Sequence, residues 1–242
     1  MNTTPKNIAV IGCSGAIGGA LTQQLTSTYP DASIHAFSRH KFAHNSPHLS
    51  YHQINYQDEF TIADCALAAS QQRPLDIVIV ATGILHEGEL MPEKSLRELS
   101  AKKFQRLFEV NTIIPALLAK YFLPQLNRAN RSLFAVLSAR VGSISDNQLG
   151  GWYAYRASKA ALNMIIKNVA IEMARHNKQA IIVGLHPGTV DSKLSKPFQR
   201  HVPNGKLFSA TYSAQRLLQV LQSLTPAQSG KCFAWDGQEV RP

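Results

Sequence analysis

The amino-acid sequence predicts an α/β fold: a single doubly wound domain with about seven parallel strands and helices on both faces. Three observations lead to this prediction. Short apolar runs alternate with segments of helical periodicity, a glycine-rich turn follows the first run, and 242 residues suffice for one such domain but hardly for two. Strict alternation of this kind implies parallel strands joined by right-handed crossovers.

The apolar runs are expected to form the strands. They cover residues 7–11, 32–37, 49–54, 76–81, 133–138, 180–185 and 231–235. The run at 76–81 reads DIVIVA, which is typical of a strand buried on both faces of a parallel sheet. Segments with helical spacing cover residues 16–28, 57–72, 95–109, 110–127, 152–176 and 210–223. The long connection 192–209 is expected to be a lid or a binding loop.

Composition and charge exclude several classes of protein. The chain contains no run of about 18 apolar residues, the length needed to span a membrane. Residues 1–6 lack the pattern of a signal peptide, so we expect a cytoplasmic protein. The cysteines Cys13, Cys65 and Cys232 are widely spaced, and five histidines at 35–52 fall on a strand, a loop and a strand, so no metal site is expected.

The net charge of +10 favours anionic partners. Lysine and arginine are scattered, without a dense run or interleaved aromatic residues, so nucleic acid is not expected to be a partner. An anionic cofactor or substrate explains the charge, and so does a basic surface without a specific ligand.

The turn after the first strand has the composition of a phosphate-binding loop. Glycine lets the backbone turn tightly and approach a pyrophosphate, whose charge is met by N–H groups at the start of the following helix. The residues expected to contact a dinucleotide here are Gly12, Ser14, Gly15, Ala16, Ile17 and Gly18. An ordinary strand-to-helix turn is the alternative, and the position after the first strand favours the dinucleotide.

The end of the second strand distinguishes between the two nicotinamide cofactors. Enzymes that bind the unphosphorylated dinucleotide usually carry a carboxylate there, for the ribose hydroxyls. This chain has Ser38 and Arg39 instead, which can bind a 2′-phosphate through a hydroxyl and a guanidinium fork. We therefore expect NADP(H) in preference to NAD(H), with a solvated Arg39 as the alternative.

Tyr155 and Lys159 are candidates for proton transfer at the start of the helix 152–176. Residues four apart share one face of a helix, so the two side chains project together. A free tyrosine has a pKa near ~10, and a neighbouring ammonium favours the phenolate and lowers that pKa. The pair follows the fifth strand, on the side where doubly wound sheets hold their ligands.

Together these features resemble the short-chain dehydrogenase/reductase family, over nearly the whole chain. The glycine turn, Asn111, Tyr155 with Lys159, and Pro187-Gly188 follow in the family's order, and the stretches at 81–86, 142–144 and 153–156 are similar to the C-factor-like carbonyl reductase branch. The resemblance implies one Rossmann domain over 1–242, with a cofactor half (roughly 1–130) and a catalytic and substrate-loop half (roughly 131–242).

The resemblance also implies a role for each site residue. Tyr155 would protonate a carbonyl oxygen during reduction, and Lys159 would lower the pKa of that tyrosine and bind the nicotinamide ribose. Asn111 would hold a water that links the lysine to solvent. The further implied cofactor contacts are Asn55, Tyr56, Ala81, Thr82, Gly83, Tyr155, Lys159, Pro187, Gly188, Val190 and Ser192. A homodimer through the helices 110–127 and 152–176 is also expected.

One departure from the family bears on catalysis. The family usually ends its fifth strand with two serines, and the second hydrogen-bonds the substrate oxygen. Here Ser138 is followed by Ala139, and Ser138 should face the opposite side, so Ser143 is the candidate replacement. We therefore expect an NADPH-dependent reductase or dehydrogenase of a small carbonyl or alcohol. The alternative is an NADP-binding signalling or regulatory protein with weak or lost catalysis.

Overall fold

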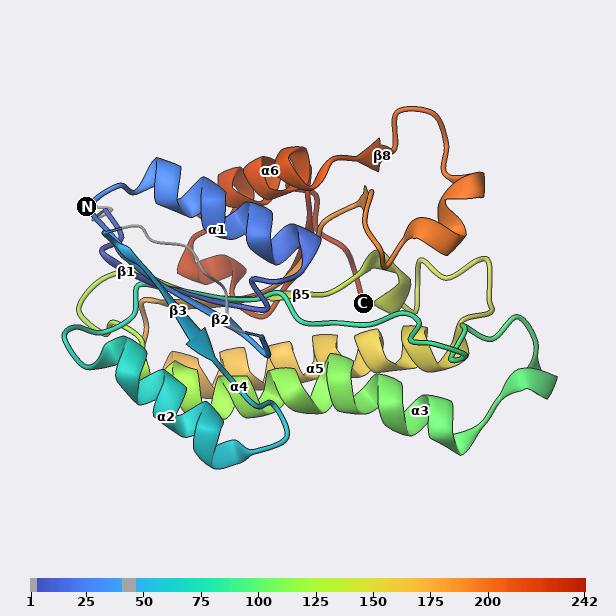
Figure 1. Ribbon diagram of the computed structural model, residues 1–242, viewed down its shortest axis with the longest axis horizontal. Coiled ribbons are helices and arrows are strands. Elements are labelled where there is room, and N and C mark those ends of the chain that lie inside the picture. The colour runs from blue at the N-terminus through green and yellow to red at the C-terminus, as the bar shows by residue number, and fades with distance from the viewer. Residues whose placement is uncertain (1–3, 41–46) are drawn as a thin grey trace.

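The computed structural model describes residues 4–40 and 47–242, and its central feature is one parallel sheet (Figure 1). Within these residues the sheet has seven strands in the order β3-β2-β1-β4-β5-β6-β9, all paired in parallel. The strands are β1 (Asn7–Ile11), β2 (Ser33–Ser38), β3 (Leu49–Gln53), β4 (Ile77–Val80), β5 (Ser132–Leu137), β6 (Ala180–His186) and β9 (Cys232–Ala234). The predicted doubly wound fold is confirmed.

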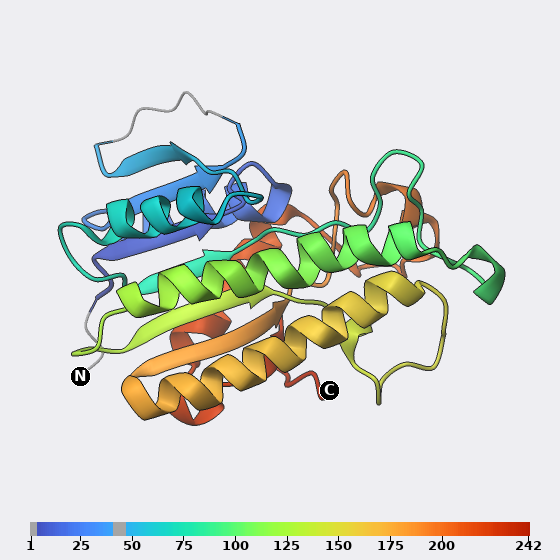
Figure 2. The same ribbon diagram turned by 90° about the horizontal axis from the view of Figure 1, so that it is seen from below.

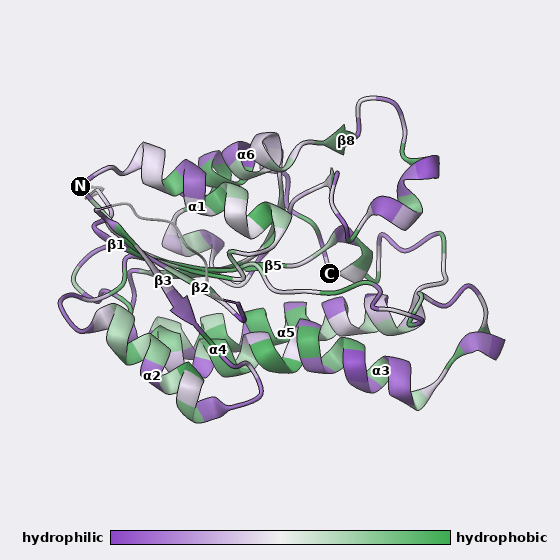
Figure 3. Cartoon of the chain, in the orientation of Figure 1, coloured by the Kyte–Doolittle hydropathy of each residue, from purple (hydrophilic) through white to green (hydrophobic). Residues whose placement is uncertain are grey.

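Helices cover both faces of this sheet (Figures 1 and 2). One face carries α1 (Ala16–Thr28) and α6 (Ala210–Ser223); the other carries α2 (Glu59–Ser70), α4 (Ile114–Phe122) and α5 (Tyr153–His176). Alternate residues of β1 enter the two cores: Ile8 and Val10 pack beneath α1 and α6, while Ala9 and Ile11 pack beneath α2, α4 and α5. Figure 3 shows the resulting hydrophobic sheet between helices that carry both hydrophobic and hydrophilic residues. No described helix combines the length and apolar character needed to cross a membrane.

The predicted helices 95–109 and 110–127 are wrong as two separate elements. A helix begins at α3 (Ala101–Phe108), where the Ser100 hydroxyl accepts a hydrogen bond from the Lys103 N–H, and it continues into α4. The junction is a π-helical turn, η2 (Glu109–Ile113), in which the Ile114 N–H bonds to the Glu109 carbonyl. Pro115 follows and has no N–H for the Asn111 carbonyl, which explains why the regular ladder breaks here.

The segment between β6 and α6, residues 187–209, has structure that the sequence pattern did not predict. It contains the paired two-residue strands β7 (Thr189–Val190) and β8 (Leu207–Phe208), and between them the 3-10 segment η5 (Lys196–His201). Strands of two residues show no periodicity, so this pairing has no local signal. The connection lies beyond the carboxyl ends of the central strands, on the same side as the start of α5 (Figure 2).

The turn between β1 and α1 depends on glycine at two of its positions. A Cβ atom at Gly18 would lie 2.2 Å from the Gly12 carbonyl oxygen, and Gly12 itself has a φ of +90°. At Gly15, by contrast, a Cβ atom would lie 3.4 Å from the same oxygen, which is ordinary contact.

We therefore predict that Gly18→Ala destabilises the protein while Gly15→Ala does not. The added methyl group at 18 must displace backbone, which should lower the free energy of unfolding by about 2–3 kcal/mol. Gly15→Ala should leave that free energy within about 1 kcal/mol of the wild-type value. Urea titrations of both variants measure the difference, and equal stabilities would contradict this account of the turn.

Candidate active site

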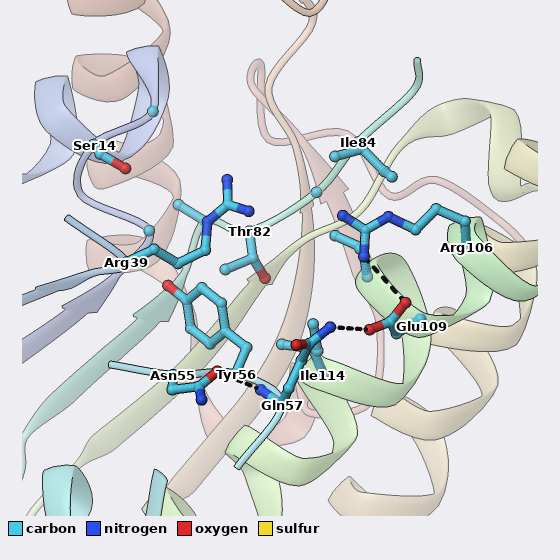
Figure 4. A pocket seen from close by; sticks show the side chains of 15 residues that line it. Ser14, Arg39, Asn55, Tyr56, Gln57, Thr82, Ile84, Arg106, Glu109 and Ile114 are labelled. Atoms are coloured by element: carbon cyan, nitrogen blue, oxygen red, sulfur yellow. Dashed lines mark hydrogen bonds and ion pairs between the residues drawn. The ribbon is translucent and has the colours of Figure 1, made fainter. Parts of the chain in front are cut away.

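A groove of about 260 Å³ lies at the carboxyl ends of β1, β2 and β4 (Figure 4). It contains many of the residues predicted to bind a dinucleotide, although they come from four separate parts of the chain. The lining residues are Gly12, Ser14, Gly15, Arg39, Asn55, Tyr56, Gln57, Ala81, Thr82, Gly83, Ile84, Arg106, Glu109, Val110 and Ile114. The structure therefore brings together the glycine turn, the end of β2, the segment after β3 and the segment after β4.

The glycine turn is held against the two neighbouring strands. The N–H groups of Gly12 and Cys13 both donate to the Phe37 carbonyl, at 2.8 and 3.1 Å. A Cβ atom at Gly12 would lie 2.9 Å from the Ala81 carbonyl carbon, so the backbones of the turn and of the segment after β4 touch directly. Ala16, Ile17 and Gly18 do not line the groove. They begin α1, and Gly18 packs beneath Gly12.

Arg39 and Ser38 play different parts at the end of β2. The Arg39 side chain extends into the groove between Ser14 and Thr82 (Figure 4). Ser38 is buried, and its hydroxyl donates to the His40 carbonyl and accepts from the His40 N–H. Ser38 therefore closes a turn and does not line the groove, so Arg39 is the predicted phosphate contact that the structure brings to the site.

Two hydroxyl groups in the groove have no partner among the described residues. Tyr56 Oη and Thr82 Oγ1 are buried and make no hydrogen bond with the described part of the chain. Buried polar groups without a partner are uncommon in folded proteins, because each costs roughly 1–3 kcal/mol. A polar ligand such as the adenosine half of a dinucleotide would satisfy them, so the groove fits the predicted cofactor.

The far wall of the groove contains residues that the sequence reasoning missed. Arg106 forms a bidentate ion pair with Glu87, at 2.8 and 2.9 Å, and also bonds to Glu109 at 3.0 Å. Gln57 donates to the second Glu109 oxygen at 3.2 Å. No sequence motif links these positions; the π-helical turn that contains Glu109 brings it to the groove.

Asn111 and Lys159 lie next to Gly83, which lines the groove. A Cβ atom at Gly83 would lie 3.4 Å from Asn111 Oδ1 and 3.5 Å from Lys159 Nζ, which is ordinary contact with both groups. The Asn111 amide exchanges two 2.9 Å hydrogen bonds with the Ile84 backbone and donates to Ser158 Oγ at 3.1 Å. Because these bonds occupy the side chain, it ties the segment after β4 to α5, and the water relay expected of Asn111 stays a prediction.

Burial sets the proton affinities of Tyr155 and Lys159. Lys159 is 4% exposed, and its ammonium donates to the Leu137 carbonyl at 2.9 Å. Loss of hydration lowers the pKa of Lys159 to about 8 and raises the pKa of Tyr155 to about 12. Burial is the cause of the Tyr155 shift, so the lowering of the Tyr155 pKa that the resemblance implied for Lys159 is not seen in this structure.

The hydroxyls near the usual serine position are engaged elsewhere. Ser138 donates to Asn163 Oδ1 at 2.6 Å, so its hydroxyl turns toward α5 and is engaged there. Ala139 follows it as a buried methyl group. The Ser143 hydroxyl accepts from the Asp146 N–H at 3.1 Å and lies 3.4 Å from Ser145 Oγ. Ser143 thus closes its own loop, and its role as the replacement serine stays a prediction.

The segment Pro187–Ser192 lies outside the groove described above. A Cβ atom at Gly188 would lie 2.6 Å from the Phe208 ring, and the buried Val190 accepts a hydrogen bond from Ser195 Oγ at 2.5 Å. Pro187 accepts from Ser213 on α6, and the Ser192 hydroxyl accepts from the Ser195 N–H at 3.4 Å. These contacts join β6 to the long connection, and the predicted nicotinamide contacts of this segment stay untested.

Some chemically suggestive residues are accounted for by packing. His35 and His52 lie side by side on β2 and β3, 3.1 Å apart between ring nitrogens, and His44 lies outside the described residues. Burial lowers the pKa of His186 to about 4, which keeps it neutral at the end of β6.

Comparison with known proteins agrees with this arrangement. A family model described as short chain dehydrogenase matches residues 6–203. The C-signal of Myxococcus xanthus is 30% identical over 146 residues, which is 60% of this chain and 82% of that protein.

Two solved structures have the same fold over almost their whole length. The carbonyl reductase Sniffer of D. melanogaster has a TM-score of 0.86 and 20% identity, covering 99% of this chain and 100% of that chain. An NADPH-bound carbonyl reductase from chicken fatty liver has a TM-score of 0.85 and 23% identity, with the same coverage.

The buried Lys159 predicts a particular pH dependence of stability. Its pKa falls from the ordinary value of 10.5 to about 8 on folding, so the unfolded chain binds more protons between these values. The contribution of Lys159 to the free energy of unfolding therefore rises with pH across this range. Tyr155 acts in the opposite direction, but only between pH 10.0 and about 12.

Between pH 8 and 10, wild-type protein should gain stability relative to Lys159→Met by up to about 1.4 kcal/mol per pH unit. Guanidinium titrations of both proteins at several pH values measure this difference, in which groups common to both proteins cancel. A difference that does not change with pH would contradict a buried, protonatable Lys159.

Proposed function

Because this chain belongs to the short-chain dehydrogenase family, we propose that it is an NADP(H)-dependent reductase or dehydrogenase of a small carbonyl or alcohol. Tyr155 is the acid and base of the proposed reaction. The observation that carries the proposal is the continuity of the site. Gly83 lines the groove together with Arg39 and the two unpartnered hydroxyls, and it also lies next to Asn111 and Lys159.

The preference for NADP(H) rests on Arg39. Its guanidinium extends into the groove at the end of β2, where a 2′-phosphate on the adenosine ribose would lie. Tyr56 and Thr82 would hold the adenosine half through their free hydroxyls. The NADPH-bound carbonyl reductase of the same fold supports this assignment.

The chemistry divides between the cofactor and the chain. A bound nicotinamide would supply or accept the hydride at the carbonyl carbon. An ordinary tyrosine, with a pKa near ~10, is already protonated at neutral pH, and burial raises the pKa of Tyr155 further, to about 12. Tyr155 can therefore donate a proton to the carbonyl oxygen as negative charge develops there. Lys159, with a pKa lowered to about 8, is the neighbouring group that can exchange a proton near neutral pH.

Ala139 favours a second candidate function. Without the usual serine hydroxyl, a loss of ~10²–10³ in rate is expected, since one such donor contributes that much. A dinucleotide-binding regulatory protein with weak catalysis fits this feature and the similarity to C-signal. Tight NADPH binding without turnover on any carbonyl compound would favour this alternative.

A homodimer is part of the proposal. Ile113 in η2 and Met164 and Ile171 on α5 are 51%, 60% and 49% exposed, although all three are large and apolar. They belong to the helices that lie side by side on the outer face of the molecule (Figure 2). A second copy would cover such residues.

We predict that Tyr155→Phe lowers kcat for carbonyl reduction by about 10²–10⁴-fold, because it removes the general acid. NADPH affinity should change less than about threefold, since the hydroxyl carries little of the binding energy in the groove. Consumption of NADPH with a panel of aldehydes and ketones measures the rate. Tyr153→Phe, on the same helix turn, is the matched control and should keep its activity. If no carbonyl is reduced and Tyr155→Phe behaves like wild type, the proposed reaction is wrong.

Arg39→Ala should weaken NADPH binding by about ten- to a hundredfold and leave NADH binding nearly unchanged. A hydrogen bond between charged groups contributes about 1.5–3 kcal/mol, and NADH lacks the 2′-phosphate. Cofactor fluorescence titrations give both dissociation constants. Arg73→Ala, which removes an exposed cation before β4, is the control for net charge. Equal weakening for both cofactors would count against a 2′-phosphate contact.

A further inference from the structure

The entry into α5 has an unusual backbone. Gly150, Gly151 and Trp152 are consecutive residues with φ values of +62°, +65° and +50°. Trp152 is the one non-glycine residue with positive φ among residues 4–40 and 47–242. Bulky residues rarely adopt this conformation, which costs of order 1–3 kcal/mol and persists only where surrounding contacts enforce it. The turn ends three residues before Tyr155.

Glu93 accepts hydrogen bonds from N–H groups at the end of this turn and at the start of α5. α5 begins after Trp152, whose side chain offers no hydrogen-bond cap, so the first N–H groups of the helix need another acceptor. The Glu93 carbonyl accepts from the Trp152 N–H at 2.5 Å, and Glu93 Oε2 accepts from the Ala154 N–H at 3.3 Å. A residue far away in sequence thus caps the helix by accepting from N–H groups at its start.

Arg156 donates hydrogen bonds to the carbonyl groups of the same turn. Arg156 Nε donates to the carbonyls of Gly150 and Gly151, at 3.2 and 3.1 Å. Its Nη1 reaches the Val141 carbonyl at 3.4 Å, in the segment after β5 that contains Ala139. The main chain and the carboxylate of Glu93 therefore accept from the N–H groups of Trp152 and Ala154, while the Arg156 guanidinium donates to the carbonyls of Gly150 and Gly151.

The turn sets the position of the Trp152 ring. This ring packs edge-on against Tyr155, with centroids 6.2 Å apart, and against Phe198 of the long connection, at 5.1 Å. Phe198 in turn contacts His86, at 5.8 Å, and a ring nitrogen of His86 lies 3.2 Å from the Lys193 carbonyl. Trp152 thus joins the candidate acid to the segment predicted to cover the substrate.

Capping the helix with Glu93 carries the free-energy cost of burying a carboxyl group. It is 1% exposed, and its Oε1 is buried without a hydrogen-bond partner among the described residues. Serine or aspartate at the N-cap position would cap α5 without burying a distant carboxylate. Backbone strain and a half-satisfied buried carboxylate therefore coincide next to Tyr155, which points to a role in placing that residue.

We propose that Glu93 and Arg156 are positioning residues, which hold the turn 150–152 so that Tyr155 and the Trp152 ring meet the substrate in a defined geometry. The proposal rests on the proposed function of Tyr155. Neither residue needs to contact the reacting atoms. Their loss should lower kcat with little effect on NADPH binding, because the cofactor groove does not include them.

The test compares Glu93→Gln, Glu93→Ala and Glu98→Gln. Glutamine at 93 keeps an acceptor for the Ala154 N–H, whereas alanine removes it. Glu98 is the control, an exposed carboxylate in the same segment between β4 and α3, and it accepts from the Lys94 N–H. Glu93→Ala should lose about ten- to a hundredfold in kcat, the cost of a small misplacement of an acid. Glu93→Gln should recover at least a third of wild-type kcat, and Glu98→Gln should match wild type.

A second readout does not depend on activity. The chain has two tryptophans, so Trp235→Phe leaves Trp152 as the sole indole fluorophore. In that background Glu93→Ala should shift the Trp152 emission to the red, and Glu93→Gln should not. If wild type reduces no carbonyl, the proposed function fails. The Trp152 emission still tests whether Glu93 holds the turn 150–152.

Unchanged kcat and unchanged emission in Glu93→Ala would overturn the proposal, as would an equal loss of kcat in Glu93→Gln and Glu93→Ala. If Glu93→Ala does not fold, Arg156→Lys and Arg156→Leu replace it. The proposal then requires a lower kcat and a red-shifted emission in Arg156→Leu, with partial recovery in Arg156→Lys. Wild-type values of both quantities in Arg156→Leu would overturn it.

Discussion

The rest of the site depends on how the ammonium group of Lys159 is held in the interior of the protein. A cation removed from water is costly unless an acceptor meets it, and here the Leu137 carbonyl at the end of β5 does so. This bond fixes α5 against the carboxyl end of β5. Close packing also requires glycine at 142, since a Cβ atom there would lie 2.8 Å from the Lys159 carbonyl carbon. The position of Tyr155, one helical turn earlier, follows from that contact.

A second constraint links the cofactor groove to the same helix. Pro115 lacks the N–H that a regular helix needs, and the π-helical turn before it contains both Glu109 and Asn111. Glu109 faces the groove, whereas the Asn111 amide bonds to the Ile84 backbone and to Ser158 on α5. One local break in a helix therefore connects β4, α4 and α5, and places Gly83 between the groove and Lys159.

The surroundings of Tyr155 differ from those that the family resemblance implied. Ser138 bonds to Asn163, position 139 is a methyl group, and Ser143 closes its own loop. In the proposed reaction the substrate oxygen would therefore depend mainly on Tyr155 itself. Rigid placement of the tyrosine then matters more than it would beside a serine donor, and the turn 150–152 supplies such placement through Glu93 and Arg156.

Local patterns in the sequence determined the elements of the fold and one half of the site. Apolar runs and helical spacing depend on neighbours within a few residues, so the strands, most helices, the glycine turn and Arg39 could be predicted. The separate helices at 95–109 and 110–127 could not be corrected from periodicity, because a π-turn of five residues is too short to change the apolar spacing of the helix around it.

The tertiary structure alone decided the contacts that join distant segments. Glu93 caps α5, Gln57 meets Glu109, β7 pairs with β8, and burial rather than the neighbouring lysine sets the Tyr155 pKa. Each depends on groups far apart in the chain that meet only after the sheet forms, and on the loss of water around them. No spacing rule encodes such meetings, because hydrogen-bond partners and burial are properties of the packed molecule.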